Sequence, residues 1–270
     1  MELFESVKVS KNKTLNFPIL SSPELQIPGR KPVGLVEIDW QNSITNDLKF
    51  CVPFINGWHE LVNNQQADTS TLDANNFMSS HLGEKAFRFG GDHNEYIEYP
   101  NDPGFAFNQT KGYTILARIS LDSIADFRSI CCYKLTDDSE PFLMFYSNDA
   151  SYSSLSWGNL TISEKGINTG DINITPGDGQ FHTIIITMDG VNPVNISSWN
   201  CWIDGVPLTI NTQGNFGSVG NTTKLGAWDN TLHEWPGFVS LQARWDRSLN
   251  DVEVISLFKD PYQIFRPRIR

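Results

Sequence analysis

The sequence predicts an all-β protein, a two-sheet antiparallel sandwich with one short helix near the C-terminus and an extended arm at the N-terminus. Residues 113–121 and 181–188 are rich in β-branched residues and alternate between apolar and polar positions, as half-buried strands do. Many further short segments are separated by clusters of Gly, Asn, Asp and Pro, which is typical of sandwiches. Only residues 250–260 have a convincing helical pattern.

The two clearest strands indicate which side chains face the core. One face of the first strand carries Tyr113, Ile115, Ala117, Ile119 and Leu121. One face of the second strand carries Ile184, Ile186 and Met188. Asp-Gly dipeptides at 189–190 and 204–205 supply turns, because both residue types tolerate the positive φ angles of tight hairpins.

The expected helix has a start signal and a stop signal. Asn250 can cap its first turn, with Glu253 three residues later as in a capping box. Pro261 ends it, because proline cannot continue a helix. The apolar stripe of this helix consists of Leu249, Val252, Ile255 and Phe258.

The first part of the chain, residues 1–34, is predicted to be an arm without a core of its own. Pro18, Pro23, Pro28 and Pro32 block helices and central strands in this part. Apolar side chains between the prolines favour burial, so we expect the arm to pack on a neighbouring subunit or another partner. The residues expected to make this contact are Phe4, Leu15, Phe17, Ile19 and Leu20.

The rest of the chain divides into a sandwich, residues 35–260, and a basic tail, residues 261–270. Arg266, Arg268 and Arg270 give the tail positive charge on a chain whose net charge is −11, and we expect them to bind an acidic partner surface. The overall acidity argues against nucleic acid as a partner. No apolar stretch reaches the ~20 residues of a membrane helix, so we expect no membrane partner.

The cysteines and the first residues bear on the compartment. The chain has four cysteines and no C-x-x-C pair, so we expect buried free thiols instead of a zinc site or a redox motif. The first residues lack the basic and apolar regions of a signal peptide, so we expect synthesis in a cytoplasm.

Four motifs in the sandwich region carry a resemblance to a family. They are GDGQFH at 177–182, WIDGVPL at 202–208, the pair FRFGGD and YIEYP at 87–92 and 96–100, and the segment from GFV to RWDRSL at 237–249. These motifs resemble elements of laminin-G-like domains, and along the chain they follow one another in the same order as in that family. The resemblance covers about residues 48 to 260 and implies the concanavalin-A-like jelly-roll fold.

A narrower resemblance lies at the two ends of the chain. LFKDPYQIFRP at 257–267 is similar to the ending of laminin-G-like proteins of tailed bacteriophages, and KPVG at 31–34 and SITNDL at 43–48 are similar to their opening. The resemblance implies a structural protein located in the virion, as a capsid decoration or a head or tail appendage anchored by the arm. It implies major capsid or other virion proteins as partners, and a homo-oligomer.

The sequence gives little sign of catalysis or of a metal. Glu37 and Asp39 resemble the start of the signature of sandwich-fold glycoside hydrolases, but Gln41 replaces the second carboxylate that such a mechanism needs. Asp92 and Asn94 lie on a loop that binds calcium in some relatives, but Ser240 replaces a further acidic ligand. We therefore expect a protein that is not an enzyme and that holds no metal or cofactor.

The tryptophans leave a second function open, a carbohydrate-binding adhesin on a phage fibre or cell surface. Aromatic faces suit the C–H surfaces of sugars, although most tryptophans of a large sandwich fill its core. Trp228, between polar residues in a turn-like stretch, is the candidate for contact with a host-surface glycan. The same two interpretations, core and glycan contact, apply to Trp58, Trp157, Trp199, Trp202 and Trp235.

Overall fold

The structure of the protein is a computed structural model. It describes residues 30–32, 34–55, 57–70, 72, 77–81, 83–89, 95–99, 112–122, 128–134, 141–147, 156–157, 167–168, 180–189, 199–208, 222–226 and 235–268. Within these residues the chain is almost entirely β, and one α-helix, α1, spans Asp251–Lys259. None of the helices in this part is long and apolar enough to cross a membrane.

One large sheet has eight strands in the order β13-β12-β11-β6-β15-β4-β3, with β2 paired to β15 beyond the end of β4. All the strand pairs described in this sheet are antiparallel. Its strands are β2 (Leu48–Val52), β3 (Phe77–His81), β4 (Glu84–Phe89), β6 (Tyr113–Leu121), β11 (His182–Met188), β12 (Trp199–Ile203), β13 (Val206–Pro207) and β15 (Gly237–Trp245). We call it the eight-stranded sheet.

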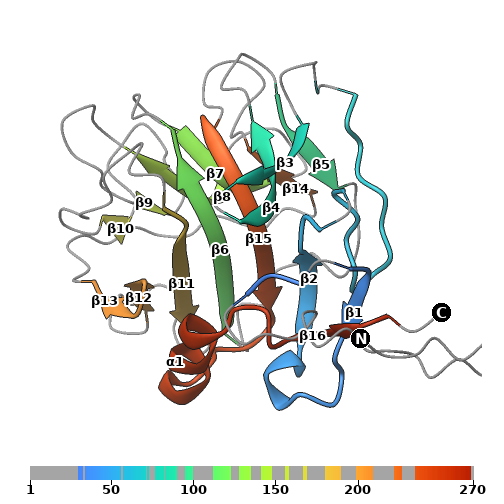
Figure 1. Cartoon of the computed structure of the whole chain (residues 1–270). Helices are drawn as coiled ribbons and strands as arrows, with labels where there is room; N and C mark the ends of the chain where they lie inside the picture. Colours follow the sequence, from blue (N-terminus) through green and yellow to red (C-terminus); the bar gives the residue numbers. More distant parts are fainter. Residues whose placement is uncertain are drawn as a thin grey trace, which may run out of the picture.

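A second sheet has six strands in the order β10-β9-β8-β7-β14-β5 and lies behind the first in Figure 1. Its strands are β5 (Ile97–Tyr99), β7 (Arg128–Lys134), β8 (Pro141–Ser147), β9 (Ser156–Trp157), β10 (Ile167–Asn168) and β14 (Thr222–Leu225). A small sheet pairs β1 (Val36–Ile38) with β16 (Phe265–Pro267). This two-sheet antiparallel sandwich with one short helix confirms the predicted fold class.

The core between the two sheets is formed by the side chains that the strand patterns predicted. Ile115, Ala117 and Ile119 of β6 and Ile184 and Ile186 of β11 belong to it. They meet apolar side chains of the six-stranded sheet, among which are Ile97, Tyr99 and Leu225. The alternation of both strands therefore predicted correctly which face meets the six-stranded sheet, although the opposite face of both strands is buried as well.

A second core covers the outer face of the eight-stranded sheet. Leu116, Ile185 and Trp245 of that sheet pack there against residues from both ends of the described chain. The covering residues come from β1, α1 and the stretch that leads into β16; they include Val36, Ile38, Val254, Leu257, Tyr262, Ile264 and Phe265. Residues that we assigned to the tail are thus buried on the sandwich, because they cover the apolar outer face of the sheet.

Helix α1 begins as predicted, but only the two ends of its expected apolar stripe, Leu249 and Phe258, pack against the second core. Asn250 caps it in a complete capping box with Glu253. Val254 and Leu257 are buried, whereas Val252 and Ile255 of the predicted stripe are 77% and 53% exposed. Val254 and Leu257 are one turn apart on the face that meets the second core, and the stripe 252–255 points away from it. The structure therefore packs Leu249 and Phe258 of the predicted apolar stripe against the core and leaves Val252 and Ile255 exposed.

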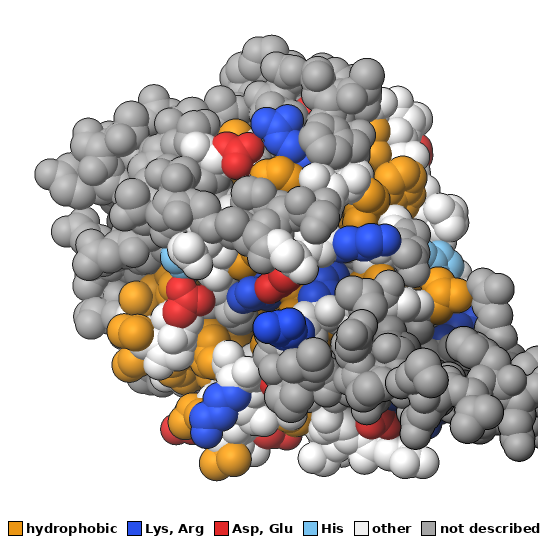
Figure 2. Space-filling model, viewed as in Figure 1, with side chains coloured by type: hydrophobic (Ala, Val, Ile, Leu, Met, Phe, Trp, Pro, Cys, Tyr) orange, Lys and Arg blue, Asp and Glu red, His pale blue; other side chains and the backbone are white. Residues whose placement is uncertain are grey.

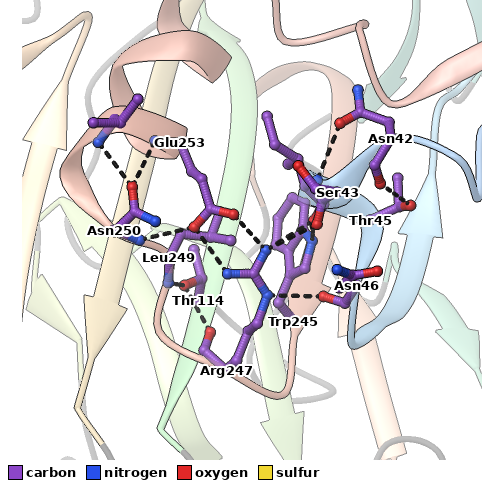
Figure 3. A network of polar contacts seen from close by, with 12 residues as sticks. Asn42, Ser43, Thr45, Asn46, Thr114, Trp245, Arg247, Leu249, Asn250 and Glu253 are labelled. Carbon is purple, nitrogen blue, oxygen red and sulfur yellow. Dashed lines mark hydrogen bonds and ion pairs between the residues drawn. The ribbon is translucent and has the colours of Figure 1, made fainter.

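An arginine ties α1 to the 3-10 turn η2 (Ser43–Thr45), as Figure 3 shows. The Arg247 guanidinium donates to both Glu253 carboxylate oxygens at 2.8 Å. It also donates to the carbonyl of Asn46 at 2.9 Å and to those of Ser43 and Ile44 at 3.3 Å. The hydrogen bonds from Arg247 hold the pKa of Glu253 below its ordinary value, so the carboxylate stays charged in this contact.

The same network reaches two strands of the eight-stranded sheet. The Trp245 indole N–H donates to the Ile44 carbonyl at 2.7 Å. The Thr114 hydroxyl donates to the Arg247 carbonyl and accepts from the Leu249 N–H, both at 2.9 Å. The turn at 43–46 is thereby fixed to β6, β15 and α1 at once (Figure 3).

Buried thiols and phenols make the folded state less stable at alkaline pH. Burial raises the pKa of Cys51, Cys201, Tyr99 and Tyr262, so all four stay neutral in the folded protein. In the unfolded chain they ionise with pKa values of about 8.5 for Cys and about 10 for Tyr. The unfolded state then releases protons that the folded state keeps. Stability is fully present below about pH 8.5 and falls above it. Burial lowers the pKa of Lys31, so this group makes stability rise with pH. It is one group against the four above, so the fall in stability prevails.

We expect the melting temperature, measured by calorimetry, to fall by several degrees between pH 8 and pH 10.5. Each group contributes up to about 1.4 kcal/mol per pH unit while only the unfolded form titrates. The variant Cys201→Ala should show a shallower fall. A melting temperature that stays constant to pH 10.5 would contradict the buried neutral state of these groups.

The Arg247 contact gives a second prediction. Arg247→Met removes hydrogen bonds to a charged partner and to three carbonyls. We expect it to lower the free energy of unfolding in urea by about 1–3 kcal/mol. The control is Arg266→Met, which breaks an exposed ion pair and should cost less than about 1 kcal/mol. Equal losses in the two variants would show that the Arg247 network does not fasten α1.

Candidate functional site

The structure describes only part of the residues that the sequence singled out for binding. Arg266 and Arg268 lie in the described part. The other candidates, which lie outside the described residues, are Phe4, Leu15, Phe17, Ile19, Leu20, Trp228 and Arg270. Asp92 and Asn94 of the expected calcium loop lie outside them as well. The contacts predicted for these residues stay predictions.

Arg266 already has an acidic partner within the chain. It stands opposite Glu37 in the β1–β16 pair, and its Nε donates to Glu37 Oε1 at 2.8 Å. The two side chains are 43% and 42% exposed, so water screens this pair strongly. Arg268 is exposed, and its backbone N–H donates to the Leu35 carbonyl at 3.0 Å.

The carboxylates that resemble a hydrolase signature have structural partners. Glu37 accepts from Arg266, and Asp39 Oδ1 accepts from the Gln41 N–H at 3.2 Å in a local turn. Ser240, at the position of a missing calcium ligand, is buried and its hydroxyl lies 3.3 Å from the Tyr262 hydroxyl. In the part of the chain that the structure describes, no three His, Cys, Asp or Glu side chains are placed to hold a metal ion.

His182 at the start of β11 serves the hairpin beside it. Its Nδ1 lies 2.7 Å from Asp204 Oδ2, and the other oxygen of Asp204 accepts from the Thr183 N–H at 2.8 Å. Asp204 and Gly205 have φ angles of +50° and +84°, as the tight turn between β12 and β13 requires. The predicted hairpin is confirmed, and the contacts of His182 are those of a structural residue.

Charged side chains gather on the outer face of the eight-stranded sheet (Figure 2). The Arg118 Nε donates to both oxygens of Glu84 at 3.1 and 3.0 Å, and its Nη1 donates to the Thr183 hydroxyl at 2.9 Å. The Tyr262 hydroxyl donates to Glu84 Oε2 at 2.6 Å. Three strands and the C-terminal stretch therefore share one polar network, which we call the Glu84 network.

The Glu84 network keeps fixed protonation states. Burial alone would raise the pKa of Glu84, but hydrogen bonds from Arg118 and Tyr262 and the nearby positive charges outweigh it and lower the pKa. Burial and the Glu84 charge raise the pKa of Tyr262, so its hydroxyl remains a donor. A charged carboxylate that is fully engaged by its own chain is suited to holding segments together, and less suited to proton transfer with a substrate.

The exposed aromatic residue that stands out is Trp40, which is 54% exposed. It lies in a turn, residues 39–45, between β1 and β2; we call it the Trp40 turn. The Asp39 N–H donates to the Ile264 carbonyl at 2.9 Å, and the Trp40 N–H to the Ile38 carbonyl at 3.2 Å. The turn is therefore fastened to the C-terminal stretch immediately before Trp40.

Hydrogen bonds within the Trp40 turn fix its backbone further. The Asn42 N–H donates to the Asp39 carbonyl at 3.0 Å, and the Asn42 amide donates to the Gln263 carbonyl at 3.0 Å. The Thr45 hydroxyl donates to the carbonyls of Asp39 and Asn42 at 3.0 and 2.7 Å. A backbone held in this way presents the Trp40 side chain with little freedom to lose on binding.

Trp40 is not among the tryptophans that the sequence predicts as candidates for glycan contact, all of which lie later in the chain. Of those, Trp235 is buried, and Trp58 and Trp202 are half-buried against the two cores, in agreement with a mainly structural role. The signal for Trp40 is its position directly after an apolar strand and within the polar stretch Asp-Trp-Gln-Asn-Ser. That pattern places a large aromatic side chain on a surface turn.

No protein-family model and no curated protein match the sequence. Solved structures do match. Trypanosoma rangeli sialidase in complex with sialic acid is 14% identical, with a TM-score of 0.56, over 89% of this chain and 37% of that one. The binding domain of Paraclostridial Mosquitocidal Protein 1 is 18% identical, with a TM-score of 0.57, over 80% of this chain and 52% of that one. The Botulinum neurotoxin serotype G binding domain is 14% identical, with a TM-score of 0.56, over 78% and 50%.

These neighbours correct one expectation from the sequence. We expected a protein that is not an enzyme because catalytic motifs are missing, and sialidases among the neighbours contradict that expectation. Motifs of other enzymes are a poor guide here, since catalytic groups assemble in space and not in sequence. The chain spans about a third to a half of the length of these proteins, and at such identities the likeness shows the fold alone. The fold of this chain is a concanavalin-A-like jelly-roll sandwich.

Proposed function

We propose that the protein is a carbohydrate-binding sandwich and that a sugar ring stacks on Trp40. The observation that carries this proposal is a half-exposed tryptophan on a turn whose backbone is fixed by hydrogen bonds on both sides. An indole face offers a large apolar surface, and the exposed polar residues Gln41 and Ser43 beside it offer partners for hydroxyl groups.

The neighbours support a role of this fold in binding. Trypanosoma rangeli sialidase carries sialic acid in one structure and the inhibitor DANA in another, and two toxin chains are named as binding domains. Low identity transfers no residue from them to this chain. The site in this chain therefore has to rest on its own exposed residues.

Trp40→Ala should weaken the binding of sugars without affecting the fold. We expect the dissociation constant for the better bound of lactose and 3′-sialyllactose, measured by isothermal titration calorimetry, to rise at least tenfold. Loss of a stacking surface of this size is worth about 1.4 kcal/mol or more. The melting temperature should hardly change, because the side chain is half-exposed and an exposed site contributes little to stability.

The matched control is Val252→Ala, which removes an exposed apolar side chain from α1. It should bind both sugars as the unchanged protein does. Either of two results would contradict the proposal. The first is that the protein binds neither sugar and no other sugar on a glycan array; the second is that Trp40→Ala binds sugars as tightly as the unchanged protein. In the second case Trp40 would be left as a contact for a protein partner.

A structural protein of a phage virion is the second candidate function. It is supported by the resemblance of residues 257–267 to the ending of such proteins, and by the placement of the two chain ends. Val36 pairs with Pro267, and the Arg268 N–H donates to the Leu35 carbonyl. The predicted arm and the basic tail thus start from neighbouring points, from which both can reach one partner.

Neutralising the basic tail tests this candidate. We expect the triple variant Arg266→Gln, Arg268→Gln, Arg270→Gln to co-sediment less with phage particles that lack the protein, and the difference to grow as salt is lowered. Glu37→Gln is the control for the lost ion pair with Arg266. Unchanged co-sedimentation of the triple variant, together with loss of sugar binding by Trp40→Ala, would decide against the virion role of the tail.

A further inference from the structure

Lys31, which precedes β1 in the chain, has a buried side chain that contacts the eight-stranded sheet. Its side chain is among the buried charged groups, with 6% of its surface exposed. The ammonium donates to the carbonyl of Lys85 on β4 at 2.5 Å and to the carbonyl of Ser240 on β15. A lysine in this position gives up its hydration, so its contacts with the two carbonyls have to replace water.

The two carbonyls lie where β15 changes its partner. The antiparallel pairing of β15 with β4 ends at Val239, and its pairing with β2 begins at Gln242. The register with β6 shifts at the same place, between Val239 and Leu241. Between the two pairings, this edge of β15 is paired to none of the described strands, while its other edge stays paired to β6; we call this place the Ser240 gap. The Lys31 ammonium supplies donors inside this gap, where a neighbouring strand would otherwise supply them.

The C-terminal stretch closes over the same lysine. The Tyr262 ring centroid lies 5.8 Å from the Lys31 Nζ, at cation–π distance. The Tyr262 hydroxyl donates to Glu84, which carries the negative charge of the Glu84 network. The Lys31 side chain therefore lies between the eight-stranded sheet and the Tyr262 ring.

The segments that meet at Lys31 also hold the Trp40 turn. Five residues after Lys31 the chain enters β1, and β1 leads directly into the turn. On the other side, the carbonyls of Gln263 and Ile264, directly after Tyr262, accept from Asn42 and Asp39. Loss of the Lys31 contacts would therefore affect both segments that hold the turn, which are β1 and the C-terminal stretch.

We infer that Lys31 is a positioning residue for the Trp40 turn: its insertion into the Ser240 gap fixes β1 and the C-terminal stretch, and these fix Trp40. The part of this inference that concerns sugar binding rests on the proposed function. The part that concerns the turn does not.

The test compares Lys31→Met with Lys85→Met by hydrogen–deuterium exchange and mass spectrometry. Lys31→Met keeps an apolar stem and removes the donors, whereas Lys85→Met alters an exposed side chain and leaves its carbonyl in place. We expect exchange in residues 34–46 to become at least tenfold faster in Lys31→Met, with β11 unchanged, and no change in Lys85→Met. The dissociation constant of Lys31→Met for the better bound of lactose and 3′-sialyllactose should rise severalfold.

Three outcomes would overturn the inference. They are unchanged exchange in residues 34–46, equal acceleration throughout the sheet, and faster exchange with unchanged sugar affinity in a protein whose Trp40→Ala variant has lost binding. If Trp40→Ala binds sugars normally, the proposed function fails, whereas local acceleration in Lys31→Met still supports the anchoring of the turn.

A measurement on the unchanged protein covers the case in which Lys31→Met does not fold. Acetic anhydride should acetylate Lys85 rapidly in the native protein and Lys31 at least a hundredfold more slowly, because the Lys31 amine is buried and engaged. Equal acetylation of both lysines, read by mass spectrometry, would overturn the inference without any variant.

Discussion

Strand β15 is the element on which the rest of the structure depends, because all nine of its residues are buried. Its neighbours β6, β4 and β2 pair along its length, and both of its faces carry core. A strand buried on both faces needs a cover on each side. The six-stranded sheet covers one face, and α1 together with β1 and residues 262–265 covers the other (Figure 1). These segments pack there because the outer face of β15 and its neighbouring strands is apolar and is stabilised by burial.

Covering this outer face has an electrostatic consequence. Arg118, Glu84 and Lys31 would be hydrated on an ordinary outer face of a sandwich, and here they lie beneath the C-terminal stretch. Buried charges are tolerated only when partners satisfy them. Each of the three has such partners, and Tyr262 links Glu84 to the cover. The same contacts that satisfy the charges hold the two ends in place.

The sandwich fold and the exposed Trp40 turn bear on function in different ways. The fold is shared with chains named as sialidases and as toxin binding domains, so it does not separate catalysis from binding. The particular residues of this chain carry more weight. Glu84 is engaged by its own chain, whereas Trp40 is presented to solvent on a fixed backbone. That contrast favours a binding surface at the Trp40 turn.

By itself, the sequence determined the local structure. Alternation in residues 113–121 and 181–188 predicted two core strands, the Asp204-Gly205 pair predicted a hairpin, and Asn250 with Glu253 predicted the start of α1, because these signals act between near neighbours. The tertiary structure decided what depends on distant partners. Which face of α1 is buried, that Lys31 lies in the Ser240 gap, and that Trp40 is exposed all follow from how both chain ends pack on β15. Residues more than two hundred positions apart meet there, and no local pattern encodes such a contact.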